Sequence, residues 1–279
     1  MQTDYTSNPI GIFDSGIGGL TVARAVAECL PEENLIYFGD TAHLPYGDKS
    51  TTSIQAYSIK ICNFLLTQNC KVILIACNSA SAAAYELVKE YVGSKATVIS
   101  VIEPTIQYIE QYHQQHHIGL IGTKQTVNSN VYKKKIDQLN QNITLQSLAT
   151  PLLVPMIEEN FFSKTIQQEI ISEYLSHQSL EAIDALILGC THYPLIKEEI
   201  KQYYQTHKKT VQIIDSSERV AQTLKKTLED KKITNINNQT TAKTGFRNFY
   251  VSDYTQSFEE SAKIFFGQQI HLALYPLWD

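Results

Sequence analysis

The chain has 279 residues, a formal net charge of −5 and 43% apolar residues. The acidic balance gives no reason to expect nucleic acid or an anionic membrane surface as a partner, and the apolar runs are shorter than the roughly 20 residues that span a bilayer. Residues 1–9 lack the basic start and apolar stretch of a secretory signal, so we expect a cytoplasmic globular protein.

Strands and helices alternate along the first part of the chain. Near-continuous apolar runs predict strands, and apolar residues at helical spacing predict helices between them. The predicted strands are 10–15, 35–40, 72–77 and 97–104, and the predicted helices are 17–29, 51–69 and 79–91. This alternation is typical of parallel sheets that are covered by helices on both faces.

A second series of elements follows and resembles the first. It comprises predicted strands at 117–123, 142–150 and 185–190, a helix near 126–139, helices within 155–176, and further strands at 211–216 and 248–253. IGIFDS at the start of the first series is similar to IGLIGT in the second, and VILIACNS is similar to ALILGCTH. This internal duplication predicts an α/β fold of two pseudo-symmetric lobes with mainly parallel sheets. We expect the first lobe to comprise 1–100 plus 211–279 and the second to comprise 101–210.

Two of the five cysteines stand at equivalent strand ends. Cys77 ends the strand 72–77 and Cys190 ends the strand 185–190, and small polar residues follow each. Ligands of open α/β sheets bind at the carboxyl edge, so two facing lobes would place both thiols across one cleft. The helix that begins after Cys77 should lower the pKa of this thiol, and His192 is a possible proton partner for Cys190. Two alternatives are a pair of packed buried thiols and a zinc site of Cys77, Cys190 and His192, although Cys-x-His is not a usual ligand spacing.

The segment FDSGIGG at 13–19 partly matches a dinucleotide-binding fingerprint, with Asp40 about 20 residues further on. The match is incomplete because Thr21 occupies the third small position and the Asp14 carboxylate would repel a pyrophosphate. We therefore interpret the glycines as a tight turn that permits close approach, with Asp14 directed into the cleft. A capping role for Asp14 and a non-catalytic nucleotide-binding module remain alternatives.

Four segments carry a resemblance to a known family: IGIFDSGIGGLTV, YFGDTAHLPYG, ACNSASA and LGCTHYPLI, with VPMIEEN and IIDSSERVA in addition. Together they resemble the glutamate racemase family of the aspartate/glutamate racemase superfamily. His192 stands where aspartate racemases carry an acidic residue, which favours glutamate. Ser79 replaces a common Thr, and Thr150 replaces a common Cys.

The resemblance implies racemisation of glutamate without a cofactor or metal, supplying D-glutamate for peptidoglycan. Cys77 would act on D-glutamate and Cys190 on L-glutamate, with Asp14, His192 and Glu158 assisting. The implied substrate-binding residues are Asp14, Ser15, Tyr46, Gly47, Asn78, Ser79, Thr123, Thr191 and His192. A homodimer without nucleic-acid or membrane partners is also implied. Racemisation of aspartate or a hydantoin by the same chemistry is the related alternative.

Overall fold

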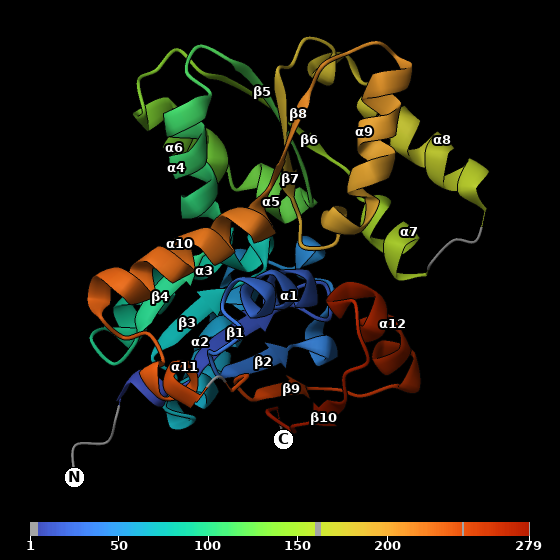
Figure 1. Ribbon diagram of the computed structural model, residues 1–279. Coiled ribbons are helices and arrows are strands. Elements are labelled where there is room, and N and C mark those ends of the chain that lie inside the picture. The colour runs from blue at the N-terminus through green and yellow to red at the C-terminus, as the bar shows by residue number, and fades with distance from the viewer. Residues whose placement is uncertain (1–4, 160–162, 242, 279) are drawn as a thin grey trace.

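The computed structural model describes residues 5–159, 163–241 and 243–278 and contains two sheets of parallel strands (Figure 1). Residues 1–4 of the N-terminal segment and residues 160–162 of the predicted helical stretch 155–176 lie outside the described residues. No helix within the described ranges combines the length and apolar character that crossing a membrane requires.

The first sheet has six strands in the order β10-β9-β2-β1-β3-β4. Its strands are β1 (Ile10–Asp14), β2 (Leu35–Gly39), β3 (Val72–Ile75), β4 (Thr97–Ser100), β9 (Arg247–Val251) and β10 (Leu272–Leu274). The associated helices are α1 (Leu20–Cys29), α2 (Thr51–Thr67), α3 (Asn78–Val92), α11 (Ile236–Thr241) and α12 (Gln256–Phe266). Every residue of β1, β2 and β3 is buried, because helices cover both faces of the sheet and leave no solvent face for polar residues.

The second sheet has four strands in the order β6-β5-β7-β8. Its strands are β5 (His117–Gly122), β6 (Thr144–Ala149), β7 (Ala185–Gly189) and β8 (Gln212–Asp215), with helices α5 (Lys124–Asn128), α6 (Val131–Gln138), α7 (Leu153–Glu158), α8 (Lys164–Leu175) and α9 (Lys197–Thr206). The order β2-β1-β3-β4 of the first sheet repeats here as β6-β5-β7-β8, and all these pairs are parallel. The predicted α/β class and the internal duplication are therefore confirmed at the level of topology.

The chain returns to the first lobe later than we expected. The strand predicted at 211–216 is β8, and it pairs with β7 at the edge of the second sheet. The prediction that the chain returns to the first lobe at residue 211 was therefore wrong, because the strand that begins there belongs to the second sheet. The physical reason lies in the duplication itself, since β8 is the counterpart of β4 and completes the second sheet.

Two other predicted elements differ in extent. The strand predicted over 97–104 ends at Ser100, and α4 (Ile102–Tyr112) begins immediately and leads to the second lobe. The helix predicted near 126–139 is divided into α5 and α6 at Asn130, which adopts a left-handed φ of +55°. This break separates α5, which begins after Thr123, from α6.

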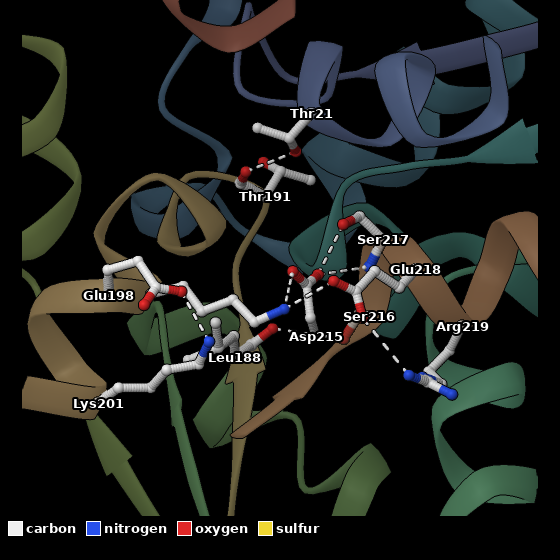
Figure 2. Close-up of polar contacts among 11 residues, drawn as sticks. Thr21, Leu188, Thr191, Glu198, Lys201, Asp215, Ser216, Ser217, Glu218 and Arg219 are labelled. Atoms are coloured by element: carbon white, nitrogen blue, oxygen red, sulfur yellow. Dashed lines mark hydrogen bonds and ion pairs between the residues drawn. The ribbon is translucent and has the colours of Figure 1, made fainter. Parts of the chain in front are cut away.

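The return connection from β8 to α10 (Ser216–Lys231) is fixed by polar contacts, as Figure 2 shows. Asp215 caps the helix by accepting hydrogen bonds from the backbone N–H of Ser217 at 3.0 Å and from its hydroxyl at 2.6 Å. Lys197 Nζ lies 3.3 Å from Asp215 and 2.7 Å from Glu218. The two lobes also touch directly, since the Thr21 hydroxyl donates to the Thr191 carbonyl at 2.8 Å. Helix α10 thus leaves the second sheet in a defined direction and lies at the junction between the lobes (Figure 1).

Candidate active site

A cavity of about 210 Å³ lies between the carboxyl edges of the two sheets. Residues that follow β1, β3, β5 and β7 line it, as expected for ligand sites in parallel α/β sheets. The predicted residues that line it are Ser15, Tyr46, Gly47, Cys77, Asn78, Ser79, Thr123, Glu158, Cys190, Thr191 and His192. Asp14 is the one predicted site residue that does not line the cavity.

Cys77 lies at the N-terminus of α3 with its side chain 5% exposed. Its Sγ accepts a hydrogen bond from the Ala80 N–H at 3.4 Å and lies 3.7 Å from the Ser15 hydroxyl. The predicted helix-terminus setting is present, but its predicted electrostatic outcome is wrong. Burial and the nearby Asp14 charge raise the pKa of the Cys77 thiol to about 12, and the hydrogen bonds with Ala80 and Ser15 offset this only in part. Cys77 is therefore a protonated thiol at neutral pH.

Cys190 has a different set of partners. His192 Nδ1 lies 3.6 Å from Cys190 Sγ, and His192 Nε2 lies 2.8 Å from Glu158 Oε1. Burial acts to lower the pKa of His192, but the hydrogen bonds and charges of Cys190 and Glu158 outweigh it and raise this pKa to about 10. His192 is therefore an imidazolium at neutral pH, donating to Glu158 on one side and facing the sulfur on the other.

The zinc interpretation required Cys77, Cys190 and His192 to converge on one metal ion. Over the ranges that the structure describes, no group of three or more His, Cys, Asp or Glu side chains is placed to hold a metal ion.

Asp14 lies behind the cavity wall, where its side chain is fully buried. It accepts a hydrogen bond from the Gly16 N–H at 3.0 Å, and the Thr191 hydroxyl lies 3.5 Å from its Oδ1. Burial raises the pKa of Asp14, against the opposing effects of the His192 charge and the backbone N–H groups. The N–H groups of the tight turn after β1 surround the carboxylate, which acts on Cys77 through its charge. A direct contact of Asp14 with substrate stays a prediction.

The glycine turn serves the contact between the lobes. A Cβ atom on Gly18 would lie 2.3 Å from His192 Cε1 and 2.7 Å from Thr191 Oγ1, and one on Gly19 would lie 2.4 Å from Asp14 Cβ. The close approach that we expected is therefore made by the second lobe, and His192 occupies the space beside Gly18. The dinucleotide interpretation fails here, because it needs that space for a pyrophosphate.

Asp40, the second half of that fingerprint, is also buried and engaged. Its carboxylate accepts hydrogen bonds from the Tyr46 hydroxyl at 2.6 Å, the Ser252 hydroxyl at 2.8 Å and the Trp278 indole N–H at 2.7 Å. His43 Nδ1 lies 3.1 Å from the same carboxylate. Asp40 thus anchors the loop that carries Tyr46 and Gly47 to the cavity wall.

Sequence reasoning missed several lining residues, among them Leu44, Asp48, Lys124, Thr150, Pro151, Val154 and Pro155. Asp48 and Lys124 come from opposite lobes, and Lys124 Nζ lies 3.5 Å from Asp48 Oδ1 in an exposed ion pair. Both are sequence neighbours of predicted residues, Gly47 and Thr123, and this adjacency was the available signal. Their pairing across the lobes was not readable from the chain.

The comparison with known proteins agrees with this geometry. The profile of the Asp/Glu/Hydantoin racemase family matches residues 20–224, and the chain belongs to this family of racemases. The protein is 40% identical over 258 residues to the glutamate racemase of Chlorobium phaeobacteroides, covering 92% of each chain. It is 38% identical over 263 residues to glutamate racemase 3 of Caldanaerobacter subterraneus, covering 94% of this chain and 92% of the relative.

A solved structure gives the same assignment. The glutamate racemase of Francisella tularensis in complex with D-glutamate matches with a TM-score of 0.88 and 38% identity, covering 98% of this chain and 99% of that one. Within the racemase family, the chain therefore groups with the glutamate racemases. The resemblance that the motifs indicated is confirmed.

Proposed function

We propose that the protein interconverts L- and D-glutamate by proton transfer at the α-carbon, with Cys77 and Cys190 as the two acid/base groups. The observation that carries this proposal is that both thiols, from equivalent strand ends of two lobes, line one cavity. A planar carbanion needs an acid/base group on each face, and two facing sheet edges supply them.

In the direction from L- to D-glutamate, Cys190 takes the α-proton and the Cys77 thiol delivers a proton to the opposite face. The reverse direction exchanges these roles. The raised pKa of Cys77, caused by burial and Asp14, supports its role as the proton donor when L-glutamate is the substrate. His192, held by Glu158 at 2.8 Å, is placed to exchange a proton with Cys190.

The polar wall of the cavity supports binding of the amino-acid end of the substrate. We propose that Ser15, Asn78, Ser79, Thr123 and Thr191 hold the α-carboxylate and ammonium, and that Tyr46 and Gly47 contact the distal end. Asn78, Ser79 and Thr191 are buried, and the burial of these three side chains strengthens their hydrogen bonds to a developing negative charge. In this scheme Asp14 acts from behind the wall on Cys77.

Proton NMR of L- and D-glutamate in D₂O, with protein stripped of metals and cofactors, tests the proposal. We expect the α-proton signal to disappear for both enantiomers, and racemisation to be lost in Cys77→Ser and Cys190→Ser. Cys29→Ser is the matched control, because Cys29 is half-buried and does not line the cavity. Exchange of aspartate but not glutamate would overturn the substrate. Exchange that persists in both cysteine variants would overturn the mechanism.

We also propose that the protein is a cytoplasmic homodimer that supplies D-glutamate for peptidoglycan. Family membership supports this role. Sedimentation equilibrium tests the dimer, and rescue of depleted cells by external D-glutamate tests the supply role.

A further inference from the structure

One residue outside the cavity lining contacts a proposed substrate-binding side chain from the opposite lobe. Tyr132 belongs to α6 of the second lobe and is 1% exposed, and its hydroxyl donates to Asn78 Oδ1 at 2.7 Å. Asn78 is the first residue of α3 in the first lobe and directly follows Cys77. The bond therefore joins the two lobes one residue away from a proposed acid/base group.

The Asn78 amide has an acceptor end and a donor end, and the structure uses only the first. An asparagine amide offers one carbonyl oxygen and two N–H donors. The oxygen is taken by Tyr132, while the amide nitrogen has no hydrogen-bond partner among the described residues, although the side chain is 3% exposed and lines the cavity. This nitrogen is not among the buried side-chain atoms that lack a partner, so it is accessible from the cavity that Asn78 lines. The cavity is the place where a carboxylate could accept its hydrogen bonds.

The surroundings of the phenol fix its position. Burial raises the pKa of Tyr132, against hydrogen bonds with Ser216 and Thr105 that lower it, so the phenol stays protonated and able to donate. Thr105 lies on α4, which leads out of the first lobe, and Ser216 begins α10, which leads back (Figures 1 and 2). The break at Asn130 separates α5 from α6, in which Tyr132 is the second residue. The hydroxyl thus lies where both connections between the lobes meet.

We propose that Tyr132 is a positioning residue, which holds Asn78 Oδ1 so that the amide N–H₂ faces the cavity and donates to the substrate carboxylate. This inference rests on the proposed role of Asn78 in binding substrate. Because the two residues come from different lobes, the amide is oriented only when the lobes are closed on each other. Contact between the lobes would then also orient the Asn78 amide for binding the substrate carboxylate.

A double-mutant cycle tests whether Tyr132 acts through Asn78. Tyr132→Phe removes only the hydroxyl, and we expect KM for both enantiomers to rise about tenfold with kcat nearly unchanged, the size expected for one lost hydrogen bond to a buried group. Asn78→Ala should raise KM at least as much, and Tyr132→Phe should have no further effect in that background. Tyr204→Phe is the matched control, since Tyr204 is 2% exposed in the same lobe and its hydroxyl has no partner among the described residues. Its KM should stay at the wild-type value.

The outcomes separate this inference from the proposed function. A rise in KM for Asn78→Ala, with Tyr132→Phe neutral or additive, would overturn the positioning role and leave the function intact. An unchanged KM for Asn78→Ala would overturn both the role of Asn78 and this inference. Should Tyr132→Phe fail to fold, the side-chain amide signal of Asn78 in the wild-type protein decides the question. It should shift on addition of glutamate, and a signal that does not respond would refute the proposal.

Discussion

The ion pair of Glu158 with His192 allows a quantitative prediction. Glu158 Oε1 lies 2.8 Å from His192 Nε2, and the Glu158 side chain is 32% exposed. At this exposure solvent screens the pair strongly, so a water-like dielectric is the cautious choice. It gives about 1.5 kcal/mol, which corresponds to about one pKa unit. Glu158→Gln should therefore lower the pKa of His192 from about 10 by about one unit or more.

The sign of the pH dependence follows from the raised pKa. Protonated His192 stabilises the fold fully below its ordinary value of 6.5, and this contribution is lost as the pH rises through about 10. In Glu158→Gln the loss should occur about one unit lower. In the proposed mechanism the imidazolium form of His192 exchanges a proton with Cys190. The alkaline limb of the kcat/KM profile should therefore move to lower pH by the same amount in Glu158→Gln.

The assay is a titration of the His192 ring signals by NMR, run beside the pH profile of racemisation. Glu159→Gln is a matched control, because it removes the same charge from the next residue, which is exposed. We expect the control to leave both curves in place. An unchanged His192 titration in Glu158→Gln would refute the electrostatic reasoning. Equal shifts in Glu158→Gln and Glu159→Gln would show that the pKa of His192 responds to net charge and not to the ion pair with Glu158.

Three further predictions concern the walls of the site. The absorbance of thiolate at 240 nm should show no step for Cys77 near pH 9 in the empty enzyme, so wild type and Cys77→Ser should give the same curve there; a step present only in wild type would contradict the burial argument. Gly18→Ala should lower the free energy of unfolding by about 1–3 kcal/mol and reduce activity, since its Cβ would meet His192 at 2.3 Å, whereas Gly16→Ala should be tolerated because its nearest contact is 3.5 Å. Trp278→Phe should cost about 1–3 kcal/mol by removing a donor at 2.7 Å from buried Asp40, and an unchanged urea midpoint would argue against that anchor.

The sequence was sufficient for features that depend on local pattern. Apolar runs located the strands, and the cysteines at their ends located the cavity, because parallel strands bring their carboxyl ends to one edge. Features that depend on distant contacts were missed. The pKa of Cys77 is set by burial and Asp14 more than by the helix that begins beside it. The role of Gly18 depends on His192, which lies in the other lobe.

The two lobes repeat one topology but surround their cysteines with different chemistry. Cys77 lies near a buried carboxylate that keeps its proton in place, whereas Cys190 lies beside an imidazolium held by Glu158. Two enantiomers have equal free energy in water, so kcat/KM must be equal in the two directions whatever the asymmetry of the site. In the proposed mechanism the difference must therefore appear in the separate values of kcat and KM. In that mechanism L-glutamate reacts with the form in which Cys77 carries the proton, and D-glutamate reacts with the form in which Cys190 carries it. The duplication therefore supplies one thiol at each sheet edge, while the two lobes give these thiols different charged neighbours.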